Sequence, residues 1–167
     1  MAEQKTLILV RHAKSSWKDT TLNDIQRPLN KRGNKDAPKM GQYMAEHKIQ
    51  PEVIFSSPGL RALTTARLIS VKIGIQPMDI KIVDRIYTFD SKELLAVIKA
   101  LKNKFDKVMI VGHNPAITEL VNYLSGSNID NVPTCGVAVL TFPIDSWKKV
   151  SKNKANLDSF DYPKKLW

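Results

Sequence analysis

The sequence predicts an α/β fold, a three-layer αβα sandwich with a mostly parallel central sheet. Short apolar runs alternate with longer amphipathic segments up to residue 124, which is the order of repeated strand–helix units. The apolar run at residues 7–10 has no polar interruption, as expected for a strand buried on both faces. Because 43% of the 167 residues are hydrophobic and 25% are charged, we expect one globular domain over residues 1–167.

The first predicted strand, residues 7–10, ends at Arg11 and His12. In open α/β sheets, ligands bind beyond the carboxyl ends of the strands. An arginine there presents a planar fork of donors that matches phosphate or carboxylate, and a histidine can act as nucleophile, proton carrier or metal ligand. This pair is therefore the first candidate for function.

Residues 16–30 lack a clear period and are predicted to form a loop over that edge of the sheet. Within the loop, Arg27 either folds over the strand ends or forms a surface ion pair with Asp24 or Asp36. A helix is predicted from residue 30 or 31 to about 47. Pro38 inside it indicates either a kink or a later helix start.

A second strand–helix unit follows, with a strand ending at residue 56 and a helix over residues 59–69. Ser57 is the predicted cap of this helix, with Pro58 at its first position. Arg61 then falls in the first helical turn, at the same edge of the sheet as the first strand's end.

The remaining elements continue the alternation and then depart from it. Their predicted ranges are strand 80–83, helix 91–101 capped by Ser91, strand 107–111 and helix 116–124. Asp84 follows the first of these strands, and His113 follows the second. The run at residues 136–142 is predicted as a last strand, antiparallel or near an edge, and residues 146–167 are basic and weakly patterned.

The charge and cysteine content limit the class of protein. The net charge of +10 favours an acidic or anionic partner, but no dense basic block is interleaved with aromatic residues, so nucleic acid is an unlikely ligand. Cys135 is the only cysteine, which excludes an internal disulfide, and it is predicted to be a small core residue. Without a membrane-length apolar run or a signal-peptide pattern, we expect a cytoplasmic protein that does not associate with membranes.

The predicted topology brings Arg11, His12, Arg61 and His113 to one edge of the sheet, with Arg27 in the loop above them. Clustered guanidinium groups repel cations, and no carboxylate cluster accompanies them, so we expect no metal and no cofactor. The same residues suit a phosphoryl group, because arginines bind its oxygens and neutralise its charge.

Four segments at these positions resemble the histidine phosphatase superfamily, the fold of phosphoglycerate mutases and acid phosphatases. They are Leu9-Val10-Arg11-His12-Ala13-Lys14-Ser15, Arg27-Pro28-Leu29 with Arg32-Gly33, the segment from Ser56 to Ala66, and Val111-Gly112-His113-Asn114-Pro115. The resemblance covers most of the chain, in the same order. The small size, the alanine at position 13 and the Arg27-Pro28-Leu29 element are similar to the small, SixA-like branch of phosphohistidine phosphatases.

The resemblance implies that His12 is the nucleophile and becomes a phosphohistidine, while Arg11, Arg61 and His113 hold the phosphate and Arg27 is a further contact. A nucleophilic His12 needs a neutral ring, so its other nitrogen should donate to a backbone carbonyl or similar acceptor. Asp84 lies in the region where larger members place the general acid. The same side chain is equally suited to bind a neighbouring arginine or a backbone amide, so both roles stay open.

The sequence therefore predicts a metal-independent phosphatase that acts on phosphohistidine or another phosphorylated protein, such as a phosphotransfer protein. A small chain without a lid insertion predicts a shallow pocket, which favours a phosphate displayed on a protein surface. Two alternatives stay open: a phosphomonoesterase or mutase for a small phosphorylated metabolite, and a non-catalytic module that binds phosphate or nucleic acid.

Overall fold

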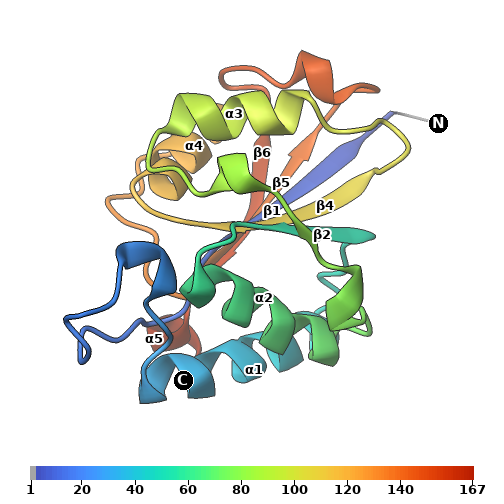
Figure 1. The fold of residues 1–167 in the computed structure, drawn as a ribbon. Helices are drawn as coiled ribbons and strands as arrows, with labels where there is room; N and C mark the ends of the chain where they lie inside the picture. The colour runs from blue at the N-terminus through green and yellow to red at the C-terminus, as the bar shows by residue number, and fades with distance from the viewer. Residues whose placement is uncertain (1–2) are drawn as a thin grey trace.

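The computed structural model, which describes residues 3–167, is a six-stranded sheet between two layers of helices (Figure 1). The strand order is β3-β2-β4-β1-β5-β6. The strands are β1 (Lys5–Arg11), β2 (Val53–Ser56), β3 (Lys81–Ile82), β4 (Lys107–Gly112), β5 (Val137–Phe142) and β6 (Asn156–Asp161). Strands β1 to β4 pair in parallel, and β5 pairs antiparallel with both β1 and β6. The predicted αβα sandwich with a mostly parallel sheet is confirmed.

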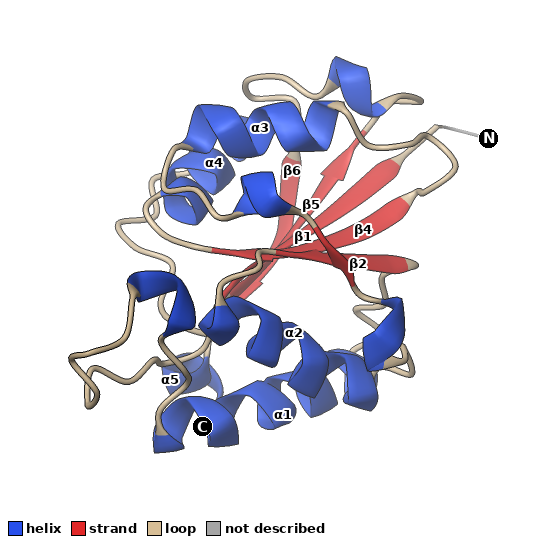
Figure 2. Ribbon diagram, in the orientation of Figure 1, coloured by secondary structure: helices blue, strands red, loops and turns tan. Residues whose placement is uncertain are grey.

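The helices cover the two faces of the sheet in pairs (Figure 2). On one face lie α1 (Lys31–Glu46) and α2 (Leu60–Lys72), and on the other lie α3 (Ser91–Lys99) and α4 (Ala116–Ser125). A short helix, α5 (Pro163–Leu166), contributes Leu166 to the same apolar cluster as the first pair. No helix within residues 3–167 is long and apolar enough to cross a membrane.

Strand β1 lies at the centre of the sheet and positions the candidate site. Its alternate residues enter different apolar clusters: Leu7 and Leu9 pack on one face, and Ile8 and Val10 on the other. All four are buried, which contributes about 1.5–3 kcal/mol for each side chain. The register pairs Arg11 with Gly112, so the two strands end side by side.

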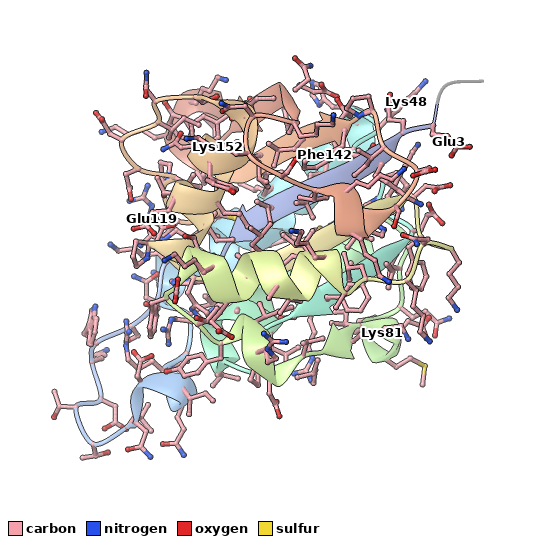
Figure 3. The ribbon with its side chains drawn as sticks, turned by 90° about the horizontal axis from the view of Figure 1, so that it is seen from above. Glu3, Lys48, Lys81, Glu119, Phe142 and Lys152 are labelled. Carbon is pink, nitrogen blue, oxygen red and sulfur yellow. The ribbon has the colours of Figure 1, made fainter. Side chains whose placement is uncertain are left out.

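Side-chain burial follows this layered arrangement (Figure 3). Phe142 lies in the interior, where it joins the cluster beneath α3 and α4. Lys81, Glu119 and Lys152, which are labelled in the same view, are exposed. Met40 and Met44 are buried as predicted, whereas Phe55 packs against the core while only partly buried.

The predicted helix starts need three corrections. Helix α1 begins at Lys31 and continues through Pro38, so a later start is wrong. The cap of α3 is Asp90, whose side chain accepts from the backbone N–H of Lys92, and Ser91 is the first helical residue. Helix α2 begins at Leu60 with Gly59 at its N-cap position, so Ser57 is not the N-cap and Pro58 is not the first helical residue, although Ser57 Oγ accepts from the backbone N–H of Gly59.

The carboxyl-terminal part departs most from the prediction. The predicted last strand, now β5, is antiparallel and lies next to the edge strand, as expected, but it is not the last strand, because β6 follows it and pairs outside it. Residues 146–167 form a short 3-10 turn, β6 and α5. Polar residues occupy much of β6, since an edge strand needs little burial, and they conceal the strand pattern in the sequence.

Candidate active site

Four residues predicted from the sequence meet at the carboxyl edge of the sheet. Arg11 ends β1 and His12 follows it, Arg61 is the second residue of α2, and His113 follows β4. The ring centroids of the two histidines are 5.4 Å apart. Burial and the charge of Arg61 both lower the pKa of Arg11, which places the two guanidinium groups in one electrostatic environment.

His12 has the tautomer that a nucleophilic ring requires. Its Nδ1 is 2.7 Å from the backbone oxygen of Ala13. A carbonyl oxygen only accepts, so Nδ1 carries the proton and Nε2 has the lone pair. Burial lowers the pKa of His12 to about 4, against the effect of the Ala13 carbonyl, and the charges of Arg61, Arg11 and Arg27 lower it further. The predicted carbonyl acceptor is confirmed, and the ring is neutral at physiological pH.

His113 forms its hydrogen bond through Nε2, whereas His12 uses Nδ1. Its Nε2 is 2.7 Å from Ser57 Oγ, which also accepts from the backbone N–H of Gly59 at 3.0 Å. Ser57 is fully buried, so its hydroxyl proton needs an acceptor, and the Nε2 lone pair of His113 provides it. The neutral His113 ring therefore carries its proton on Nδ1. Burial, followed by the neighbouring His12 and Arg61, lowers the pKa of His113 to about 3.

The close contact between the α2 N-terminus and His113 also explains a glycine. A Cβ atom at Gly59 would lie 3.1 Å from His113 Cε1 and 3.3 Å from Nε2. Any larger residue would press on the ring that the serine hydroxyl holds. A side chain at position 59 would therefore be tight against the His113 ring, whereas the backbone angle at Gly59, with φ of −54°, is open to any residue.

Three buried side-chain donors at this edge have no partner within residues 3–167. They are Arg11 Nε, Arg61 Nε and Nδ1 of His113. A buried donor without an acceptor costs about 1–3 kcal/mol, so native structures rarely retain several in one place. All three belong to residues that the sequence assigned to phosphate, and an anion with several oxygen atoms would satisfy them.

The loop before α1 adds Arg27 to the site. Its guanidinium group is buried and donates to the backbone oxygen of Ser16, to the hydroxyl of Ser15 and to the carboxylate of Asp24. The indole ring of Trp17 covers its face, with the guanidinium carbon 3.2 Å from the ring centroid. Arg27 thus pairs with Asp24, one of the two predicted alternatives, but its guanidinium group is buried against Ser15 and Ser16 rather than lying on the surface, and its role as a phosphate contact stays a prediction.

The structure adds two residues to the site that the sequence did not assign there, Asp24 and Tyr87. The carboxylate of Asp24 lies 2.9 Å from Arg61 Nη2 and 3.1 Å from Arg27 Nη1, and it accepts from the Tyr87 hydroxyl. Partial burial opposes ionisation, but the hydrogen bonds from Tyr87, Arg61 and Arg27 lower the pKa of Asp24 to about 2. The Tyr87 ring in turn packs edge-on against His113, with centroids 5.2 Å apart.

Two other predicted carboxylate contacts differ from expectation. Asp36 pairs with Arg32 at 3.4 Å, so its predicted alternative pairing with Arg27 is wrong. Asp84 begins a 3-10 turn and is exposed, and its side chain has no ion pair in the part of the chain that the structure describes. The neighbouring arginine pairs with Glu93 instead. The assignment of Asp84 as general acid stays a prediction.

Cys135 supports the site through its backbone. Its N–H donates to the backbone oxygens of Arg11 and His12 at 3.1 and 3.0 Å. The side chain is fully buried, as predicted, and burial raises the pKa of the thiol. Within residues 3–167, no three histidine, cysteine, aspartate or glutamate side chains gather where they could hold a metal ion.

Comparison with known proteins agrees with this geometry. The family model described as histidine phosphatase superfamily (branch 1) matches residues 7–87, which contain Arg11, His12 and Arg61. An uncharacterised chloroplastic protein of Arabidopsis thaliana is 30% identical, over 87% of this chain and 70% of the relative. The chain belongs to the histidine phosphatase superfamily. Family membership supports a phosphatase activity.

Solved structures of histidine phosphatases share the whole fold. A structure from Agrobacterium tumefaciens described as a "putative phosphohistidine phosphatase SixA" has a TM-score of 0.79 at 27% identity, over 95% of this chain and 98% of that one. A protein histidine phosphatase SixA, solved with tungstate, has a TM-score of 0.80 at 20% identity, over 97% and 99% of the two chains. By sequence, a 2,3-bisphosphoglycerate-dependent phosphoglycerate mutase of Mycobacterium leprae is 38% identical over 65 residues, which cover 38% of this chain and 26% of the mutase. The predicted SixA-like branch of the superfamily is confirmed.

Proposed function

We propose that this chain, as one domain over residues 1–167, is a metal-independent phosphatase that forms a phosphohistidine at His12. Its substrate is a phosphohistidine or another phosphorylated protein. The observation that carries the proposal is the set of three unpartnered donors on Arg11, Arg61 and His113 beside a neutral histidine ring. A phosphoryl group supplies three oxygens to such donors and an electrophilic phosphorus to the ring nitrogen.

In the first step, the lone pair of His12 Nε2 attacks phosphorus while the bond from phosphorus to the leaving group breaks. The Nδ1 proton stays in its hydrogen bond to Ala13, so the phosphorylated ring is a cation that this carbonyl stabilises. Arg11, Arg61 and the Nδ1–H of His113 donate to the phosphoryl oxygens as negative charge shifts onto them.

In the second step, water attacks phosphorus, and the electron pair of the P–N bond returns to Nε2. Both protons of the water leave on inorganic phosphate, which dissociates as the monoanion and leaves His12 neutral. The transfer needs no proton from the protein, because the imidazolium of the intermediate is already a good leaving group.

The charge state of the site favours a phosphohistidine over an ester. An alkoxide leaving group needs a proton donor, but Asp24, the carboxylate that contacts the site arginines, is ionised. The imidazole of a phosphohistidine carries a proton on its other nitrogen and leaves as a neutral molecule. The similarity to a structure described as a SixA phosphohistidine phosphatase supports the same substrate class.

The test is phosphate release in the presence of a chelator, from a phosphohistidine-bearing protein and from an aryl phosphate. His12→Ala is expected to abolish release from both, and a rapidly quenched native reaction should contain an acid-labile phosphoenzyme. His47→Ala is the matched control, since that histidine is exposed and bonds within α1.

Three results would contradict the proposal. An active His12→Ala variant would exclude the covalent mechanism, and faster turnover of small esters would favour a metabolite phosphatase or mutase. No turnover of any substrate, together with phosphate or nucleic-acid binding that His12→Ala does not change, would favour a non-catalytic module.

A further inference from the structure

Several exposed apolar side chains contact residues of the site or are next to them in the sequence. We define this apolar collar as Trp17, Ile25, Leu60 and Phe89, which are among the exposed large hydrophobic residues of the described chain. They come from three separate segments: the loop before α1, the start of α2 and the loop before α3. Large hydrophobic side chains exposed together commonly mark an interaction site.

Two collar residues contact a side chain of the site, and the other two are next to a site residue in the sequence. Trp17 stacks on Arg27, and Phe89 packs against the His113 ring with centroids 5.7 Å apart. Ile25 follows Asp24, and Leu60 immediately precedes Arg61. Trp17 and Phe89 therefore lie directly against two groups of the site, Arg27 and His113.

The depth of the site determines what the collar contacts. The unpartnered donors are buried, and His113 is only 1% exposed, so a phosphoryl group that reaches them passes below the collar. The collar then contacts what carries the phosphoryl group. A small polar metabolite has little apolar surface for an indole, a phenyl and two aliphatic side chains, whereas a protein surface around a phosphorylated residue has more.

Basic residues beside the collar indicate the charge of that protein surface. Lys14 and Lys18 are exposed on either side of Trp17. The backbone oxygen of Lys14 accepts from Asn30 N–H, which brings the start of α1, with its exposed Lys31 and Arg32, next to this segment. Acidic side chains would complement this flank, in accord with the net charge of +10.

We propose that the apolar collar, with the basic flank of Lys14, Lys18, Lys31 and Arg32, docks an acidic protein surface around the phosphorylated residue. This inference rests on the proposed phosphatase function and adds the surface by which the partner protein is selected. Trp17 is the expected anchor, because it is 74% exposed while its ring is held against a buried guanidinium group.

The experiment compares kcat/KM for a phosphohistidine-bearing acidic protein with kcat/KM for phosphoramidate, which has the same P–N bond and no protein surface. We expect Trp17→Ala to lower the ratio of the two values about tenfold, as for an aromatic hot-spot residue. Trp167→Ala is the matched control, because this second exposed tryptophan also stacks on a cation, Lys39, outside the site. In the native chain, high salt should also lower the ratio of kcat/KM for the phosphoprotein to kcat/KM for phosphoramidate, because it screens the basic flank.

The outcomes separate this inference from the function beneath it. If Trp17→Ala and Phe89→Ala lower kcat/KM for both substrates by the same factor, the collar only supports the site and binds no protein. If neither variant changes kcat/KM for the phosphoprotein, the docking surface lies elsewhere. Binding of anionic vesicles that Trp17→Ala abolishes, with an unchanged ratio, would assign the collar to a lipid surface. If the native chain cleaves neither substrate, the phosphatase proposal fails. The docking surface is then tested by binding: it is supported if the phosphoprotein binds His12→Ala more tightly than the double variant His12→Ala, Trp17→Ala, and contradicted if the two affinities are equal.

Discussion

The site has two halves that are built by different forces. Arg11, His12 and His113 follow strands packed in the centre of the sheet, so core packing fixes their positions. Arg27 and Asp24 belong to a loop that reaches the site through ion pairs and side-chain hydrogen bonds. The strand half therefore holds the nucleophile and the phosphate donors in fixed positions. The loop half is held over them by ion pairs and hydrogen bonds, which salt and low pH weaken.

The largest difference between the halves is expected from paired arginine substitutions. Arg11→Gln removes a donor next to phosphorus, and we expect kcat/KM for phosphoramidate to fall about 1000-fold. Arg27→Gln leaves the strand-end donors in place, so a loss of about tenfold is expected. Steady-state kinetics of both variants measures the comparison. Equal losses would show that the loop arginine is as much a part of the phosphate site as the strand arginine.

The buried histidines give the strand half a pH dependence of its own. The unfolded chain protonates His12 near pH 6.5 and the folded chain only near 4, so stability is fully present above pH 6.5 and falls as the pH decreases toward 4. The expected loss for this residue is about 2 kcal/mol between pH 7 and 4.5. Urea unfolding at pH 7 and pH 4.5 measures this loss. Between these two pH values, the free energy of unfolding should fall less in His12→Phe than in the native chain, and as much in His47→Phe as in the native chain.

Ser57 tests whether the tautomer of His113 matters. Ser57→Ala removes the donor to Nε2, which allows the proton to move from Nδ1 and costs the phosphoryl group a donor. We expect kcat to fall about tenfold with a smaller change in KM. Nitrogen NMR of the His113 ring should show Nδ1 protonated in the native chain and a mixture of tautomers in the variant. Ser57→Thr should restore both, whereas substitution of a buried serine within α2, Ser70→Ala, should change neither.

A native-like tautomer in Ser57→Ala would contradict the assigned direction of the Ser57–His113 hydrogen bond. A loss of stability alone, with kcat unchanged, would make Ser57 a packing residue rather than a positioning residue.

The same division explains what the sequence revealed. Arg11, His12 and His113 follow uninterrupted apolar runs, and parallel strands with such runs must end at one edge of the sheet, so their meeting was predictable. Asp24 has no such signal: it contacts Arg61, 37 residues away, and only the folded loop brings the two together. Tyr87 was likewise hidden, since aromatic residues after a strand are most often packing residues.

Capping and edge strands were the other limits of prediction. Ser57 has the residue type and position of a helix cap, but its hydroxyl bonds to a histidine that follows β4, 56 residues later in the chain. Strand β6 is polar because it lies at the sheet edge, so period and hydrophobicity did not distinguish it from a loop. In both cases, a tertiary contact decides between two local structures that the sequence permits equally.

The smallest expected effect concerns the stability of the loop half. The pKa of Asp24 in the folded chain, about 2, is below its unfolded value of 3.8, so its contribution is present above pH 3.8 and lost as the pH falls toward 2. Because the Asp24 side chain is 42% exposed, solvent screening limits the cost of Asp24→Asn to about 1 kcal/mol at pH 7. Urea unfolding in low and high salt measures this cost, which should shrink as salt rises. Asp19→Asn in the same loop is the control, and an equal effect of both variants would mean that Asp24 stabilises only its own loop rather than the contact with Arg61.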